Sequence, residues 1–170
     1  MWQIELIGNY PSNYKPTITN YGTVDDTNLS QILKVKTGAR VMTVMKVNTA
    51  DPLVNGSLGI VEDIVSETDG RVKYIVIKFD AEKAEIKQRK KYAHISDKYK
   101  VINGTPIFRS KIRYHLSGSK KRVHAAKATV LQFPIKLTFA LTGHKMQGQT
   151  IKKGSKVVVN LSKQMPPALA

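Results

Sequence analysis

The chain has 170 residues, of which 41% are hydrophobic, so it can bury a core and is not composed like a disordered tail. Its 28 lysines and arginines outnumber 12 aspartates and glutamates, which gives a formal net charge of +16. This excess indicates an anionic partner, nucleic acid first and a membrane surface second. No apolar stretch of membrane-spanning length and no basic amphipathic helix is present, which favours nucleic acid.

Several kinds of site lack the residues that they need. There are no cysteines, which excludes disulfides, cysteine-based zinc sites and thiol nucleophiles. Four histidines have no metal-ligand spacing, namely His94, His115, His124 and His144. The sequence also has no G-x-S-x-G, no H-E-x-x-H and no paired carboxylates beside a histidine. We therefore expect no metal site and no complete catalytic constellation.

The first 36 residues are expected to form an irregular segment. Prolines, aspartates, asparagines and a glycine crowd positions 9–28, as they do in loops. Beyond this segment, runs rich in β-branched and apolar residues predict strands over 39–47, 58–65 and 72–79. Asn55-Gly56 predicts a tight turn before the second of these strands, because both residues accept a positive φ.

A basic insertion at 81–105 separates these strands from two more, predicted over 106–116 and 122–133. In the first of the two, every second residue is a cation, namely Arg109, Lys111 and Arg113. Strand side chains alternate between faces, so the three would form one row suited to a phosphate backbone. A charged edge strand that only blocks aggregation has the same pattern. Five short strands joined by tight turns predict a small barrel.

Aromatic residues lie close to these cations in the sequence. Stacking on the bases of a single-stranded nucleic acid is one interpretation, and burial in the core is the more common use of such side chains. The residues concerned are Tyr92, Tyr99, Phe108 and Tyr114.

After Pro134 the apolar spacing lengthens and predicts a helix that ends near Gly148. Four side chains at its end could donate hydrogen bonds to phosphates or simply be solvated, namely Thr142, His144, Lys145 and Gln147. The frame G-x-x-x-x-G-x-T at 143–150 is not an ATP-binding loop, because Gln149 replaces the lysine that reaches the phosphates. The apolar run 157–161 is typical of a strand buried in a parallel sheet.

Two blocks of the sequence resemble PIF-type (petite-integration-frequency) DNA helicases, which belong to the B branch of superfamily one and are related to the RecD helicases. Residues 33–42 followed by 53–61 resemble the family pattern L-K-x-G-A-x-V-M … L-V-N-G-x-x-G-x-V. Residues 132–150 resemble helicase motif V, typically Q-F-P-L-x-L-A-x-A-x-T-I-H-K-S-Q-G-Q-T. The blocks stand in the family's order. Three positions depart from the pattern, where Thr138, Gly143 and Met146 replace the usual alanine, isoleucine and serine.

The resemblance implies a mixed α/β fold. A small Src-homology-3-like β-barrel, domain 2B of the family, would occupy 37–133 and carry the insertion 81–105. It would be inserted in an incomplete RecA-like sheet, the second motor domain of a P-loop NTPase. Residues 134–170 would return into that motor domain with motif V and stop before motif VI. Residues 1–36 would belong to the motor domain or to a linker.

The resemblance also implies a function, that of a fragment of an ATP-dependent DNA helicase. The full-length protein would couple single-stranded DNA to ATP hydrolysis, with ATP and Mg²⁺ as cofactors, in DNA repair, recombination or telomere maintenance. This chain lacks the phosphate loop, the magnesium-binding acids and the arginine finger, so we expect it to bind neither cofactor and to be inactive alone. We expect an intracellular monomer, in the nucleus or mitochondrion. The alternatives are a stand-alone basic nucleic-acid-binding barrel without catalysis and an RNA-associated basic protein.

Site residues follow from the matched motifs. By resemblance, Thr142, His144 and Lys145 would contact the DNA backbone, and Gln147 and Gly148 would lie toward the ATP cleft. Asn55 and Gly56 would shape the hairpin at the entrance of the barrel. The predicted DNA contacts are the cationic row together with Thr142, His144, Lys145, Asn55 and Gly56.

Overall fold

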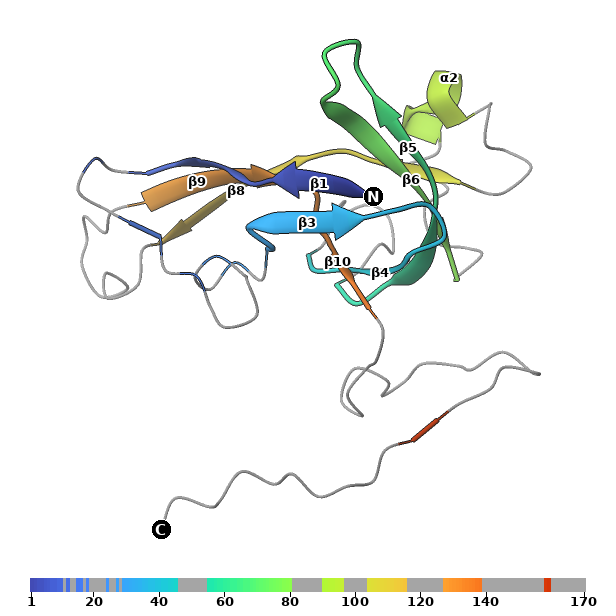
Figure 1. Ribbon diagram of the computed structural model, residues 1–170, viewed down its shortest axis with the longest axis horizontal. Helices are drawn as coiled ribbons and strands as arrows, with labels where there is room; N and C mark the ends of the chain where they lie inside the picture. Colours follow the sequence, from blue (N-terminus) through green and yellow to red (C-terminus); the bar gives the residue numbers. More distant parts are fainter. Residues whose placement is uncertain are drawn as a thin grey trace. The chain divides into compact units, whose positions relative to one another are not determined.

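The computed structural model describes residues 1–10, 12, 15–16, 18, 24, 27, 29–45, 55–80, 90–96, 104–115, 127–138 and 158–159. The chain divides into two compact units, Met1–Ala140 and Leu141–Ala170. Nearly all of the described residues belong to the first unit, and its regular structure is mostly β (Figure 1). They include the short helix α2 (Ala93–Ser96). No helix in the described part of the chain is long and apolar enough to span a membrane.

The largest sheet has five antiparallel strands in the order β10-β4-β5-β6-β7. Its strands are β10 (Ile135–Leu137), β4 (Arg40–Thr43), β5 (Leu58–Ser66), β6 (Val72–Phe79) and β7 (Thr105–Ile107). The hairpin of β5 and β6 turns at Gly70, whose φ of 80° is one that glycine adopts readily. The predicted second and third strands are thereby confirmed, with almost the predicted bounds.

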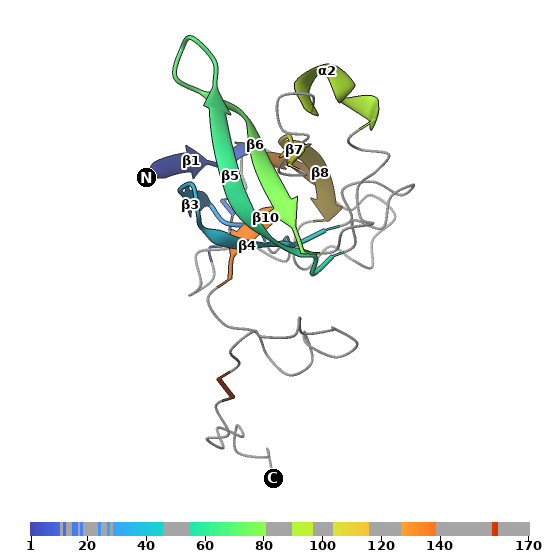
Figure 2. The same cartoon turned by 90° about the vertical axis from the view of Figure 1, so that its right-hand side faces the viewer.

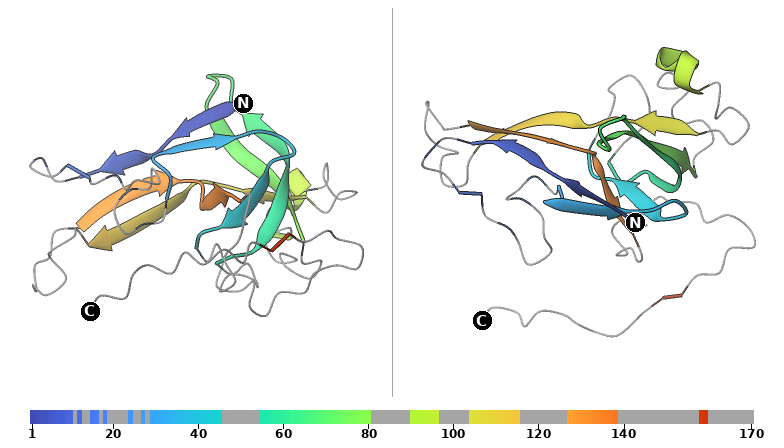
Figure 3. Two further views of the ribbon diagram at one scale, coloured as in Figure 1. Left: turned by 60° about the horizontal axis from the view of Figure 1, so that its bottom comes forward. Right: turned by 45° about the horizontal axis from the view of Figure 1, so that its top comes forward.

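Two smaller antiparallel sheets complete the first unit (Figure 3). One pairs β1 (Trp2–Glu5) with β3 (Ile32–Val35). The other has the order β2-β9-β8, formed by β2 (Ile7–Asn9), β9 (Lys127–Gln132) and β8 (Ser110–His115). The prediction that the first 36 residues are irregular was therefore wrong. The loop-forming residue types behind that prediction lie mainly between β2 and β3. β2 pairs with β9, and β3 pairs with β1.

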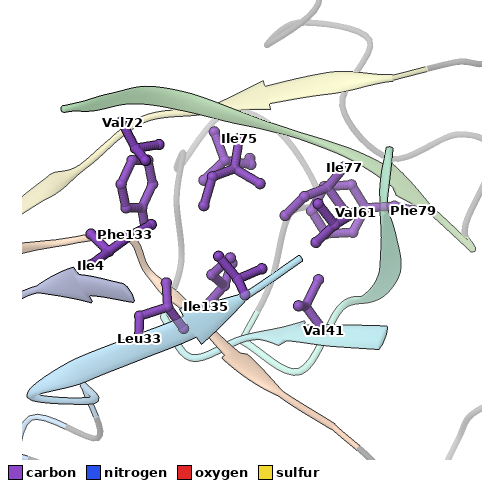
Figure 4. Close-up of a cluster of buried hydrophobic side chains, with 12 residues drawn as sticks. Ile4, Leu33, Val41, Val61, Val72, Ile75, Ile77, Phe79, Phe133 and Ile135 are labelled. Carbon is purple, nitrogen blue, oxygen red and sulfur yellow. The ribbon is translucent and has the colours of Figure 1, made fainter. Parts of the chain in front are cut away.

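A single apolar cluster joins the strands of the five-stranded sheet to β1 and β3 (Figure 4). Its buried members are Ile4, Leu33, Val35, Val41, Val61, Val72, Ile75, Ile77, Phe79, Ile107, Phe133 and Ile135. A smaller cluster of Leu29, Val44 and Val130 lies against the three-stranded sheet. The alternation of buried and exposed residues along β3 follows from this packing, because successive strand side chains face opposite sides. β6 alternates only at its ends, and its middle residues Ile75, Val76 and Ile77 are all buried.

Three predicted elements differ from the structure. The single strand expected over 106–116 is divided into β7 and β8 at Phe108 and Arg109. The helix expected after Pro134 is replaced at its start by β10, because Ile135 is buried and pairs with Thr43 of β4. The buried strand expected over 157–161 is not found at its two described residues. These are Val158 and Val159, which are 95% and 68% exposed, and no described residue pairs with them.

Gly59 of β5 lies where no side chain fits. A Cβ atom built there would come within 2.6 Å of Ile77 Cγ2 and 2.7 Å of the backbone oxygen of Lys78. We expect Gly59→Ala to lower the free energy of unfolding by about 1–3 kcal/mol, because a backbone atom cannot move away as a flexible side chain can. Urea denaturation followed by circular dichroism measures this loss. An equally stable variant would show that β5 and β6 can separate at no cost.

Candidate nucleic-acid interface

Two predicted cations lie on the open face of the three-stranded sheet. Lys111 and Arg113 of β8 are both exposed, and β8 is an edge strand in the order β2-β9-β8. Lys111 lies opposite Leu131, and Leu131 lies opposite Ile7 of β2. Directly opposed residues of an antiparallel pair share a face. We call the set of Lys111, Arg113, Leu131 and Ile7 the β8 face.

The β8 face combines charge with accessible apolar surface. Ile7 is 54% exposed, and Leu131 is half-buried. The opposite side of the same strands carries Ile112 and Val130, which pack in the smaller apolar cluster. The sheet therefore has one side against protein and one side, with both cations, toward solvent.

Arg109 does not continue this row. It precedes β8, its Nη1 atom donates a 3.0 Å hydrogen bond to the backbone oxygen of Glu5, and its guanidinium lies 5.4 Å from the centroid of the Phe133 ring. Burial lowers the pKa of Arg109, and the positive charge of Arg71 lowers it further, although a guanidinium stays charged at neutral pH. The row predicted from period two is therefore wrong for Arg109, because the strand is interrupted there.

Asn55 and Gly56 form a turn that leads into β5, as predicted. Gly56 has a φ of 99°, and its backbone nitrogen donates a 2.8 Å hydrogen bond to the oxygen of Thr43. Ser57 closes the same loop through a 3.0 Å bond from its nitrogen to Thr43 Oγ1. The geometry of the turn is thus fixed by β4. A contact of this turn with DNA stays a prediction.

The five predicted site residues of motif V lie outside the described part of the chain. These are Thr142, His144 and Lys145, predicted to contact DNA, and Gln147 and Gly148, predicted to lie near ATP. Their roles stay predictions. Among the described residues, no group of His, Cys, Asp or Glu side chains could hold a metal ion.

Two ion pairs that the sequence did not reveal hold other arginines. Arg40 of β4 bonds both carboxylate oxygens of Asp80, one of them at 2.8 Å, and this pair ties β4 to the end of β6. Arg71 bonds Asp69 across the β5–β6 turn, and its side-chain hydrogen bond lowers the pKa of the Asp69 carboxyl. The Asp-Gly-Arg turn is the sequence signal for the second pair. Neither arginine belongs to the β8 face.

Three aromatic side chains that belong to neither apolar cluster form a row. Tyr74 of β6, Phe108 after β7 and Tyr92 before α2 lie in succession. The ring centroids of Tyr74 and Phe108 are 5.5 Å apart, and those of Phe108 and Tyr92 are 4.6 Å apart. All three side chains are half-buried. Sequence reasoning named two of them and missed Tyr74, because β6 as a whole resembles a core strand.

No protein-family model matches the sequence, and no curated protein matches it. The Pif1 helicase of Candida albicans superposes with a TM-score of 0.53 at 21% identity, over 89% of this chain and 32% of that one. A Bacteroides Pif1 helicase, solved in complex with ADP-AlF3 and ssDNA, has a TM-score of 0.52 at 18% identity, over 86% of this chain and 26% of that one.

The chain has the fold of part of the Pif1 helicases. It spans between 26% and 32% of the length of these two proteins. The superposition covers 86% to 89% of this chain, and it agrees with the resemblance drawn from the sequence blocks at 33–42, 53–61 and 132–150. At this level of identity, the likeness concerns the fold alone.

Proposed function

We propose that this chain is a part of a Pif1-type, ATP-dependent DNA helicase, and that its own task is to hold single-stranded DNA. The fold likeness to two Pif1 helicases, one of them bound to ssDNA, is the observation that carries the proposal. The net charge of +16 and the cations of the β8 face support it independently. Residues 37–133 would form the Src-homology-3-like barrel. This range contains β4, β5, β6 and β7 of the five-stranded sheet, whereas β10 follows it and β8 and β9 pair in a separate sheet with β2.

In this proposal, residues 134–170 belong to the second motor domain. Motif V, with Thr142, His144 and Lys145, would grip the DNA backbone there. Gln147 and Gly148 would couple this DNA contact to the ATP site. ATP hydrolysis would supply the energy for movement along DNA in the full-length helicase. The 170 residues contain no G-x-x-x-x-G-K-[ST] loop, so they do not make a complete nucleotide site. The contribution of this chain is to bind and orient the strand.

The β8 face suits a phosphate backbone for electrostatic reasons. Lys111 and Arg113 are two residues apart on one strand, which places their Cα atoms about 7 Å from each other. Both side chains are exposed, and neither makes an ion pair with another described residue. Each can therefore replace condensed counterions on a nucleic acid without first losing a partner.

We expect the double variant Lys111→Ala/Arg113→Ala to bind single-stranded DNA more weakly and with a shallower salt dependence. Each phosphate contact on a single strand contributes about 0.7 to the slope of log K against log salt, so two lost contacts should reduce the slope by about 1.4. Fluorescence anisotropy of a labelled oligothymidine, titrated at several KCl concentrations, gives this slope.

A matched control removes two positive charges elsewhere. Lys34 of β3 and Lys78 of β6 are exposed on other strands, so Lys34→Ala/Lys78→Ala changes the net charge equally. We expect it to leave the slope nearly unchanged. Equal slopes in the two double variants would mean that the β8 face makes no specific phosphate contacts. A competitor RNA that displaces the DNA at lower concentration would favour the RNA-associated alternative.

A further inference from the structure

The aromatic row, formed by Tyr74, Phe108 and Tyr92, borders a cationic surface. Tyr92 lies directly after Lys90 and Lys91, which are both exposed. The Lys91 ammonium lies 5.3 Å from the centroid of the Tyr92 ring. An exposed lysine can reach a ring only where that ring opens toward solvent. At least part of the Tyr92 ring is therefore accessible, although Phe108 packs against it.

The row also leads to the candidate DNA contacts. Phe108 is followed directly by Arg109 and then by β8, which carries Lys111 and Arg113. α2 lies next to β7 on this side of the five-stranded sheet (Figure 2). A strand of nucleic acid that follows β8 toward β7 would therefore pass from exposed cations to half-buried rings.

We propose that the aromatic row is a base-stacking site for single-stranded nucleic acid, with Tyr92 as its outermost ring and Lys91 as the phosphate contact beside it. This inference rests on the proposed binding of single-stranded DNA and adds to it a contact with bases. Every base has a π face, so such a site tolerates any sequence. Lys91 is attracted to the ring when the site is empty and turns to a phosphate when a base covers the ring.

The row has a role in packing as well, since Phe108 and Tyr92 attach the segment before α2 to β7. Packing alone predicts that the rings contribute to stability and nothing to binding. Stacking predicts an affinity that depends on the presence of bases at constant charge. The two roles can therefore be separated by a ligand that keeps its phosphates and lacks its bases.

The test compares oligothymidine with an abasic oligonucleotide of the same length and charge, by fluorescence anisotropy. We expect the native chain to bind oligothymidine roughly five- to 150-fold more tightly, the range that corresponds to stacking of one base. Tyr92→Leu keeps apolar packing and should lose most of this preference, with unchanged affinity for the abasic strand. Tyr92→Phe keeps the ring and should retain the preference.

Equal binding of the two strands by the native chain would overturn the inference, and so would a full preference in Tyr92→Leu. The absence of salt-dependent binding to either strand would instead overturn the proposed function. If Tyr92→Leu fails to fold, crosslinking of the native chain to DNA tests the stacking proposal instead. An oligonucleotide with 5-iododeoxyuridine should form an adduct with the peptide that contains Tyr92 or Phe108, and adducts only elsewhere would contradict the proposal.

Discussion

Replacing Phe133 with alanine is expected to lower the free energy of unfolding by about 3–5 kcal/mol, the usual cost of removing a buried phenyl ring. Phe133 is completely buried and belongs to the main apolar cluster together with Ile4 and Val72 (Figure 4). The ring also lies under the Arg109 guanidinium. Its loss would leave a cavity where β1, β6 and the end of β9 meet. A domain of ordinary stability has only about 5–15 kcal/mol to lose.

Urea denaturation of purified variants, followed by circular dichroism, measures this loss. Phe133→Leu is the matched control, since it keeps most of the apolar volume and should cost less than about 1.5 kcal/mol. Ile60→Ala provides a second comparison, because Ile60 is 39% exposed. If Phe133→Ala destabilised the chain no more than Ile60→Ala, the central place of Phe133 in the core would be wrong.

The parts of the fold that the sequence predicted are those with local signals. β5 and β6 are each at least eight residues long, are rich in β-branched and apolar residues and are joined by an Asp-Gly turn, so both their type and their bounds were predictable. β1 and β3 have no such signal. They pair residues about 30 positions apart, such as Ile4 with Leu33, across a segment with the composition of a loop. Three-residue strands such as β10 are too short to show a period.

The candidate site was likewise predictable only where its signal was local in the sequence. Period two placed Lys111 and Arg113 correctly on one exposed face, because β8 is regular from Ser110 onward. It failed at Arg109, since alternation assumes a continuous strand and the break before β8 depends on how β7 and β9 are arranged. The aromatic row depends on contacts between distant segments of the chain. No spacing in the sequence relates Tyr74 to Tyr92.

The sequence block that begins the motif V resemblance has a structural role that the resemblance did not indicate. Gln132 is completely buried and ends β9. Its Nε2 atom donates hydrogen bonds of 3.1 Å to the oxygen of Ile4 and 3.2 Å to the oxygen of Ser30. Its Oε1 atom accepts a 3.0 Å bond from the nitrogen of Phe133. One amide thus connects β9 to β1 and to the residues before β3.

Gln132→Leu should therefore destabilise the chain although leucine is apolar and of similar size. The variant leaves two carbonyl oxygens and one N–H without their partner, and each unsatisfied buried group costs about 1–3 kcal/mol. We expect a loss of about 3 kcal/mol or more in urea denaturation, together with faster hydrogen exchange of the Phe133 amide. Gln3→Leu on the exposed side of β1 is the control and should change stability by less than about 0.5 kcal/mol.

Equal losses of stability in Gln132→Leu and Gln3→Leu would contradict this account. They would mean that water bonds the two carbonyl oxygens and the N–H once the amide is gone. A large difference would instead show that β1 is held to β9 by hydrogen bonds of one side chain. Arg109 depends on the same attachment, since it bonds the oxygen of Glu5 on β1. Loss of the Gln132 amide would then also loosen the segment that joins the aromatic row to the β8 face, so DNA binding should weaken together with stability.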